Sequence, residues 1–481
     1  MSSFTRTRIV WIDGDGRDVD VTPFLERDLV LERYANPGEV KQSEQTKAIF
    51  YRLQPRKRGK LGEWLRQSVP SLLDHGVSIY LLADNDNESQ FILNSVKTFQ
   101  CRAALKILTA PGSAVVAEHI KRQLDLPIAD ADIRISGDPV NDRFKLYLSR
   151  SFYGCDSVVV RRLAGGRTAK VVSAHVRFRD SVVGPRPLPF FVKFAKRNIV
   201  DEELLKYRTY VDHYIPFHLR PHLDYGRCLI GPTHGILVGS FVDHSVSLLD
   251  FLQHGGGTQV IHNLFEESLG GWRVQAYEGP KSGIKHGPLS SELQWFSIPG
   301  SILPKRFELA RSLGATKGPK ELHDALMSWR AIDFRSAPMH ADLHTDNVRV
   351  RGYDAIVIDF QRVRNGPIVV DPAFLEVSLM FTAGRDTNDG WRELANTLYL
   401  DGGFDNVPPP AREPNGREWL WNAVRQIRQI GRGCETSPRE YRTALIHCLL
   451  RRARLHDKLR KDDERGAYAY VIAEKLILAG Q

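Results

Sequence analysis

MHADLHTDNV, residues 339–348, and IVIDF, residues 356–360, decide the fold of this chain. The first segment has the order His-x-Asp-x-x-x-x-Asn, and the second is an apolar strand that ends in an aspartate. Asp342 and Asn347 are five residues apart, and Asp359 follows twelve residues later. A loop and hairpin of this length bring the three side chains to one point. Phosphoryl transfer requires such a group, because one carboxylate faces the acceptor hydroxyl while an amide oxygen and a second carboxylate bind Mg²⁺.

These segments resemble the catalytic and metal-binding loops of the aminoglycoside-phosphotransferase and choline-kinase-like family, which has a protein-kinase-like fold. That family commonly has His-Gly-Asp-Leu-His-x-x-Asn in the loop, and here Ala341 replaces the glycine. The resemblance extends over residues 145–480 and is strongest at 340–360. It implies a bilobal kinase that uses ATP and Mg²⁺.

The resemblance assigns a role to each matching residue. Asp342 is the expected catalytic residue, and Asn347 and Asp359 are the expected Mg²⁺ ligands. His340 and Asp371 are expected to support the catalytic loop structurally. The alternative is a polar loop followed by a buried strand, which explains each residue alone but not their joint spacing.

The expected nucleotide-binding residues precede this loop. Gly165 and Gly166 form a predicted hairpin turn whose backbone N–H groups can approach phosphates, and Thr168 adds a hydroxyl. Lys193 lies inside an apolar strand, so its ammonium requires an anionic partner. Glu203, on the apolar face of the next helix, is the expected partner. The alternatives are an ordinary hairpin and a lysine that extends from an edge strand.

Turn signals and periodicity predict a multidomain α/β plus α+β protein. Residues 1–135 form an α/β domain and residues 136–143 a linker. The kinase-like smaller lobe covers 144–243, with its first strand at Phe144–Leu148. The helical larger lobe covers 244–481 and contains a glycine-rich insertion at about 254–300, which is a candidate lid or acceptor-binding segment.

The N-terminal domain alternates five apolar strands with helices, which predicts a doubly wound parallel sheet. The expected strands are 8–13, 29–31, 48–53, 77–82 and 104–108, and the last expected helix is 112–124. The order resembles the receiver domain of response regulators, and Asp13 and Asp15 correspond to its metal-binding acids. The third strand has no carboxylate at the phosphoacceptor position, so we expect a pseudo-receiver that serves as a docking or dimerising module.

Composition limits the class of protein. A chain of 481 residues exceeds one ordinary core, and 42% hydrophobic with 26% charged residues is typical of soluble globular proteins. No apolar run is long enough for a membrane span, and residues 1–7 lack the apolar core of a signal peptide. The five cysteines are scattered, which argues against a zinc or disulfide framework. The expected location is the cytoplasm.

The formal charge of +10 is compatible with phosphate-bearing ligands and also with nucleic acid. The densest basic segments are RKRGK, residues 56–60, and RRAR, residues 451–454. Acidic residues soon follow the second segment, which favours a solvated helix face there. Neither segment has interleaved aromatic residues, so nucleic acid is not the favoured partner.

The leading hypothesis is a phosphotransferase with an alcohol group as acceptor, which transfers the γ-phosphoryl group of ATP to a hydroxyl or amine of unknown identity. The acceptor is a small molecule or a protein, and residues 1–135 offer a surface for a protein partner or self-association. The added domain points to bacterial signalling or defence. The alternative is a non-catalytic nucleotide-binding switch that controls a partner through the receiver-like domain.

Overall fold

The computed structural model describes residues 7–13, 19–22, 29–40, 46–52, 58–97, 99, 104–109, 132–163, 169–179, 189–231, 233–278, 283–295, 302, 304–382, 388–400, 402–406, 417–454 and 463–480. The chain divides into two compact units. The first unit comprises Met1–Glu202 and Leu223–Phe241, and the second comprises Glu203–His222 and Val242–Gln481. Each unit is described by itself.

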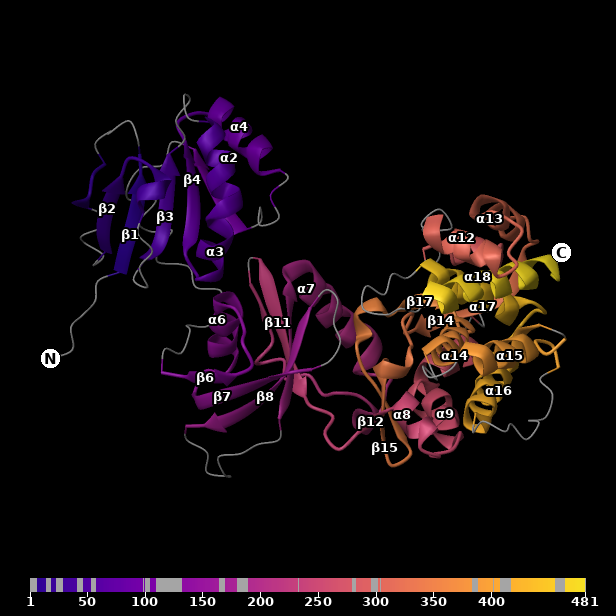
Figure 1. Cartoon of the computed structure of the whole chain (residues 1–481). Coiled ribbons are helices and arrows are strands. Elements are labelled where there is room, and N and C mark those ends of the chain that lie inside the picture. Colours follow the sequence, from indigo (N-terminus) through magenta and orange to yellow (C-terminus); the bar gives the residue numbers. More distant parts are fainter. Residues whose placement is uncertain are drawn as a thin grey trace. The chain divides into compact units, whose positions relative to one another are not determined.

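The N-terminal part of the first unit is a five-stranded parallel sheet with the order β2-β1-β3-β4-β5 (Figure 1). Its strands are β1 (Thr7–Ile12), β2 (Leu29–Tyr34), β3 (Thr46–Arg52), β4 (Ser78–Ala83) and β5 (Leu105–Thr109). The predicted five-stranded parallel sheet is therefore confirmed. The order is that of flavodoxin-like doubly wound sheets, a fold that carries many unrelated functions, so the receiver resemblance stays a prediction.

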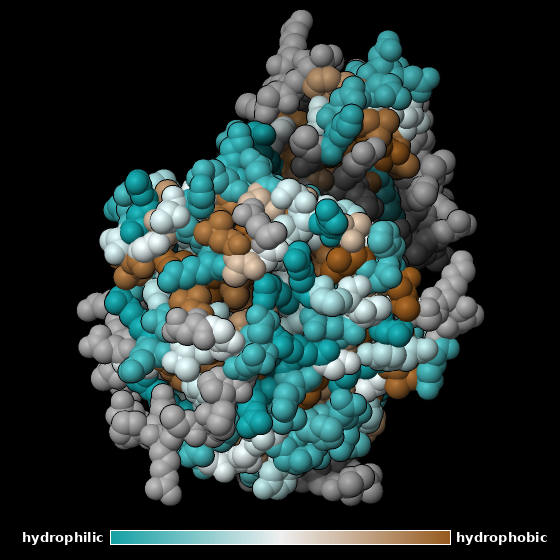
Figure 2. All heavy atoms as spheres, turned by 90° about the vertical axis from the view of Figure 1, so that its right-hand side faces the viewer, coloured by the Kyte–Doolittle hydropathy of each residue, from teal (hydrophilic) through white to brown (hydrophobic). Residues whose placement is uncertain are grey.

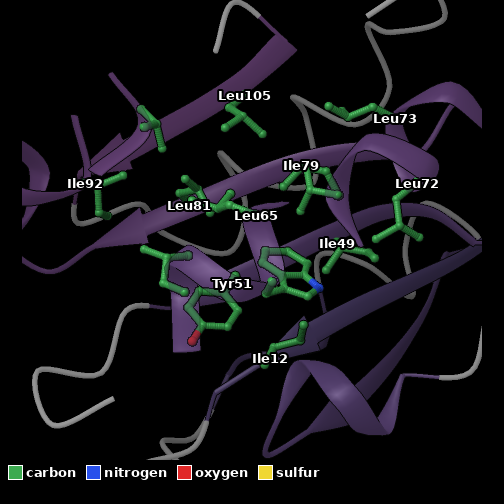
Figure 3. Packing of buried hydrophobic residues seen from close by; sticks show 14 of the residues in the cluster. Ile12, Ile49, Tyr51, Leu65, Leu72, Leu73, Ile79, Leu81, Ile92 and Leu105 are labelled. Carbon is green, nitrogen blue, oxygen red and sulfur yellow. The ribbon is translucent and has the colours of Figure 1, made fainter. Parts of the chain in front are cut away.

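Apolar side chains cover both faces of this sheet, which explains why its strands are continuously hydrophobic. On one face they pack against α2 (Arg58–Gln67), α3 (Val69–Asp74) and α4 (Asp86–Val96). Figure 3 shows part of this cluster, with residues of β1, β3 and β4 gathered against leucines of α2 and α3. On the other face Trp11, Phe50 and Tyr80 stack in a row with centroid distances of 5.5 and 4.4 Å. The helix predicted at 112–124 lies outside the described residues.

An arginine lies at the carboxyl end of β3, where a receiver carries its phosphoacceptor. Arg52 Nη1 is 3.4 Å from Asp13 Oδ2, and Arg52 Nε is 3.5 Å from Asp84 Oδ1. This cation offsets the charge of the two acids at that edge of the sheet. Asp15 lies outside the described residues.

The rest of the first unit is a six-stranded sheet with the order β10-β11-β9-β8-β7-β6. Its strands are β6 (Arg134–Gly137), β7 (Cys155–Arg162), β8 (Lys170–Phe178), β9 (Phe190–Lys196), β10 (Leu229–Ile230) and β11 (His234–Ser240). Neighbouring strands are antiparallel except β6 and β7. The predicted linker at 136–143 contains the end of β6 and the start of a helix, and the domain boundaries remain predictions.

The strand predicted at Phe144–Leu148 was wrong, because this segment lies in helix α6 (Asp142–Ser151). Asn141 caps the helix by accepting the backbone N–H of Phe144. Phe144, Tyr147 and Leu148 are fully buried at helical spacing, so one face of α6 packs on the sheet. A short apolar run fits either period, and tertiary packing selected the helix.

The second unit is mainly helical, with two three-stranded sheets ordered β12-β15-β16 and β13-β14-β17. Its strands are β12 (Val246–Ser247), β13 (Ile284–Gly287), β14 (Ile332–Met339), β15 (Val348–Arg351), β16 (Asp354–Val357) and β17 (Arg364–Pro367). Its helices are α8 (Leu248–Gln253), α9 (Gln259–Asn263), α10 (Gly270–Glu278), α11 (Leu289–Glu292), α12 (Pro304–Ser312), α13 (Pro319–Met327), α14 (Val370–Thr382), α15 (Asn388–Tyr399), α16 (Glu418–Gly433), α17 (Glu440–Arg454) and α18 (Asp463–Leu478). Helix α7 (Arg197–Lys206) begins in the first unit and ends in the second.

Much of the segment expected as an insertion is part of the core of the second unit. Leu264 and Trp272 are buried, and Trp272 Nε1 donates to the carbonyl of Tyr210 at 2.6 Å. A Cβ on Gly271 would lie 2.3 Å from the carbonyl oxygen of Tyr214. The glycine there therefore permits a close approach of two backbones.

Figure 2 shows one face of the molecule, on which hydrophilic side chains predominate and hydrophobic ones form small scattered groups. Such scattered apolar groups are ordinary on a protein surface. Within the described ranges, no helix has both the length and the apolar character that a membrane crossing requires.

A buried ion pair joins α14 to α16. Arg428 Nη2 is 2.6 Å from Glu376 Oε1, and both side chains are at most 2% exposed. Arg428 also donates to the carbonyl of Leu398, and Tyr441 donates its hydroxyl to Glu376. These additional bonds satisfy the remaining polar atoms and offset the cost of removing two charges from water.

We expect Glu376→Leu to lower the free energy of unfolding by roughly 3–5 kcal/mol, because it leaves Arg428 buried without its counter-charge. The double variant Glu376→Leu/Arg428→Met should recover a large part of that loss. Urea denaturation measures both effects. Asp405→Asn is the control, because the Asp405 carboxylate is 60% exposed in its pairs with Arg432 and Arg442, and it should cost about 1 kcal/mol or less. A double variant no more stable than the single one would contradict this account.

Candidate active site

A buried carboxylate fixes the start of the loop at 340–347. Asp371, in the first turn of α14, accepts the backbone N–H of His340 at 2.7 Å and that of Ala341 at 2.9 Å. Burial raises the pKa of Asp371, and the two N–H donors and His340 act in the opposite direction. The loop backbone is therefore attached to the core of the second unit at the position where β14 ends.

The loop backbone takes a left-handed turn directly before Asp342. Ala341 has a φ of 61° and is fully buried. A non-glycine residue in this region carries steric strain, which explains why a glycine is usual at this position of the resembled motif. Beside it, His340 is buried, and its Nε2 lies 3.0 Å from the carbonyl oxygen of Ile358. His340 thus connects the loop to the end of the hairpin.

The β15–β16 hairpin brings Asn347 close to the residue before Asp359. Val348 pairs with Val357, and Ile358 donates its N–H to the carbonyl of Asn347 at 2.9 Å. Asn347 Nδ2 in turn donates to the carbonyl of Asp342 at 2.9 Å. One buried amide therefore links the loop at Asp342 to the strand that ends at Asp359, whose own φ of 62° is left-handed.

The residue types at this point fit a magnesium ion that is held together with a nucleotide. Because Asn347 Nδ2 donates to a backbone carbonyl, its amide oxygen is the atom that would bind a metal, and the Asp359 carboxylate is exposed. Among the described residues, no group of three or more His, Cys, Asp or Glu side chains forms a metal site. Mg²⁺ commonly has only one or two protein carboxylates, because substrate phosphates and water complete its coordination.

Two arginines lie against the carboxylate of Asp342. Arg451 Nη2 is 2.6 Å from Oδ1, and Arg362 Nε is 3.3 Å from Oδ2. The Arg451 side chain is only 10% exposed, whereas that of Arg362 is 54% exposed. Burial lowers the pKa of Arg451, and the Asp342 carboxylate opposes that shift. Arg451 is therefore the stronger constraint on the orientation of the carboxylate.

The prediction of a solvated helix face at 451–454 was wrong, because Arg451 and Ala453 are buried. Sequence reasoning missed Arg451 as a site residue because 109 positions separate it from Asp342. One signal was present: Arg451 continues the buried spacing of Ala444 and Cys448 on α17. A charge on an apolar helix face requires a partner.

Among the remaining predicted site residues, Lys193 lies in the first unit, Glu203 lies in the second, and the others lie outside the described residues. Lys193 on β9 is 6% exposed and Glu203 on α7 is 5% exposed. They belong to different units, so their pairing stays a prediction. Gly165, Gly166 and Thr168 lie outside the described residues, between the antiparallel strands β7 and β8.

The segment that contains the loop, the hairpin and Asp371 matches the model of a known sequence family. The model of the phosphotransferase enzyme family matches residues 304–412. The match includes Asp342, Asn347, Asp359 and Asp371 but covers under a quarter of the chain. No curated protein sequence matches this chain.

Solved kinase structures show only loose similarity to the chain. A choline kinase from Cryptosporidium parvum aligns with a TM-score of 0.34 at 10% identity, over 67% of this chain and 91% of its own. A glucosamine kinase aligns with a TM-score of 0.32 at 11% identity, over 71% and 83%. An aminoglycoside phosphotransferase from Streptomyces rimosus aligns with a TM-score of 0.28 at 14% identity, over 56% and 92%. The functional argument therefore depends on the site itself.

The left-handed backbone at Ala341 predicts a specific order of stability. Ala341→Gly should stay close to the wild type, because the relief of strain offsets the lost methyl packing. Ala341→Val should be destabilised by roughly 2 kcal/mol more than Ala337→Val, because β-branched residues are disfavoured at positive φ. Ala337 is a matched control, since it is buried in the adjoining strand β14. Equal losses for the two valine variants, measured by urea denaturation, would contradict the strain at residue 341.

Proposed function

We propose that this chain is a Mg²⁺-dependent phosphotransferase that transfers the γ-phosphoryl group of ATP to a hydroxyl or amine of an acceptor. The observation that carries the proposal is the joint placement of Asp342, Asn347 and Asp359 by one loop and one hairpin that Asp371 anchors. The family match over the same residues supports it.

In this proposal the metal ligands come from the hairpin. Asn347 would supply an amide oxygen and Asp359 a carboxylate. Bound Mg²⁺ would neutralise charge on the nucleotide phosphates. Lys193 and the Gly165–Gly166 turn with Thr168 would bind those phosphates from the smaller lobe, and Glu203 would orient Lys193.

Asp342 would orient the acceptor group and accept its proton. A carboxylate has about four lone-pair sites, so its ion pairs with Arg451 and Arg362 leave sites for an acceptor hydroxyl. Arg451 is a positioning residue here, because it bonds Asp342 from the buried side. Its rigid guanidinium restricts the carboxylate to one orientation, and such alignment is a large part of catalysis in phosphoryl transfer.

The direct test is transfer from γ-labelled ATP, measured on the protein, in water and on added cell extract. Asp342→Asn should reduce transfer by roughly 10²–10⁴-fold while ATP still binds. Asp359→Ala and removal of Mg²⁺ with EDTA should both abolish transfer. Asp346→Asn is the matched control, because Asp346 is an exposed acid of the same loop with no proposed role. Mg²⁺-dependent ATP binding without transfer by the wild type would favour the non-catalytic switch.

A second test concerns the arginine behind Asp342. Arg451→Met should lower kcat by roughly 10²-fold, because Asp342 loses its fixed orientation. The nucleotide affinity should stay unchanged, and Arg451→Lys should restore only part of the rate because a lysine lacks the planar guanidinium. Arg454→Met, the same substitution one helical turn later, is the control. An unchanged kcat in Arg451→Met would remove Arg451 from the mechanism.

A further inference from the structure

A cavity of about 530 Å³ lies within the first unit, between helices of the N-terminal domain and the six-stranded sheet. Its lining includes Arg66 of α2, Phe99, Arg143 of α6, Lys196 at the end of β9, and Thr233 and His234 at the start of β11. Ligand sites in proteins commonly have volumes of about 300–1,000 Å³. The cavity is therefore large enough for a small metabolite.

The charged groups around this cavity have one sign. Arg66, Arg143 and Lys196 line it, and no lining residue is acidic. Arg143 is paired with the buried Asp74, with 2.5 Å between Nε and Oδ2. Arg66 and Lys196 are exposed and have no ion-pair partner among the described residues. Two exposed cations and one partly neutralised arginine favour an anionic ligand.

His234 is a titratable residue of the cavity lining. Burial lowers the pKa of His234, Asp74 opposes that shift, and the charges of Arg143, Lys196 and Lys170 add smaller effects that lower it. Its Nδ1 lies 2.8 Å from the hydroxyl of Thr233.

Beside the cavity, a polar network centred on Asp74 joins the N-terminal domain to the six-stranded sheet. Asp74, at the end of α3, is fully buried. Its side chain accepts hydrogen bonds from Tyr147 and Thr233, and its backbone carbonyl accepts Arg150 Nη1 at 2.8 Å. This network ties together α3, Arg143 of α6 and Thr233, and the last two residues line the cavity.

We propose that this cavity binds a phosphorylated small molecule, whose phosphate contacts Arg66, Arg143 and Lys196 and whose apolar part lies against Phe99. Phosphate is the favoured anion because guanidinium and ammonium groups together match its several oxygens. A small molecule is favoured over nucleic acid, because these cations line one pocket of about 530 Å³, whereas nucleic acid binds cations that follow a long groove.

The cavity lies beside β9, the strand that carries Lys193 of the proposed nucleotide site. In the β11–β9 ladder, His234 pairs with Lys196 and Leu237 pairs with Lys193. The ring of Phe194 stacks on His234 with a centroid distance of 5.0 Å. A ligand on Lys196 and His234 would therefore act on the strand that carries Lys193. This regulatory consequence, unlike the binding itself, rests on the proposed kinase function.

The test is calorimetric titration of the full chain with inorganic pyrophosphate in EDTA. We expect one site, with affinity reduced by about tenfold or more in Arg66→Glu and in Lys196→Glu, because each removes a charge-assisted hydrogen bond. Arg66→Lys and Lys196→Arg should retain most of the affinity. Lys145→Glu, an exposed substitution on α6 outside the cavity, should bind like the wild type. Both cavity positions are exposed, so the variants should fold, and thermal melting checks this.

Three results would overturn the proposal. The first is no pyrophosphate binding by the wild type, and the second is equal binding by Arg66→Glu and Lys196→Glu. The third is tighter, steeply salt-dependent binding of a single-stranded oligonucleotide through the same two residues, which would make this a nucleic-acid surface. Lys193→Met distinguishes the cavity from the proposed nucleotide site. Pyrophosphate binding at the nucleotide site would be lost in that variant, whereas binding in the cavity would remain. None of these outcomes depends on phosphoryl transfer, so failure of the proposed enzyme activity is a separate result.

Discussion

The two hydrogen bonds from His340 and Ala341 to the buried carboxylate of Asp371 are the constraint on which the candidate site depends. Three polar side chains on a loop cannot hold a metal and an acceptor unless the loop has one conformation. Asp371 provides that conformation from the first turn of a helix in the core. The strained turn at Ala341 is a local consequence, since the backbone must turn sharply to place Asp342 after both N–H groups have been used.

Around this anchor, hydrogen bonds between the polar groups of the site fix their positions relative to one another. Asn347 donates to the backbone of Asp342, and the hairpin then sets the position of Asp359. Arg451 holds the carboxylate of Asp342 from α17. A helix far along the chain thus completes a site that the loop alone leaves with one rotatable carboxylate. In the same unit, the buried Glu376–Arg428 pair joins helices α14 and α16.

The first unit shows a different use of a buried acid. Asp74 joins α3 of the N-terminal domain to α6 and β11 of the six-stranded sheet. This network makes the N-terminal domain and that sheet one compact unit. At the carboxyl end of β3, Arg52 pairs with both Asp13 and Asp84. This end of the parallel sheet therefore carries a cation at the position where a receiver has its phosphoacceptor.

The sequence by itself determined the five parallel strands, the hairpin after the loop, and the spacing of Asp342, Asn347 and Asp359, because periodicity and spacing are properties of contiguous residues. It misassigned Phe144–Leu148, since a short apolar run fits a strand or a helix equally well until packing selects one. Only the tertiary structure decided that Arg451 bonds Asp342 and that Asp74 bonds Thr233 across 159 positions. Pairs at such separations form where segments distant in the sequence pack together, and no local pattern records which polar groups will face each other.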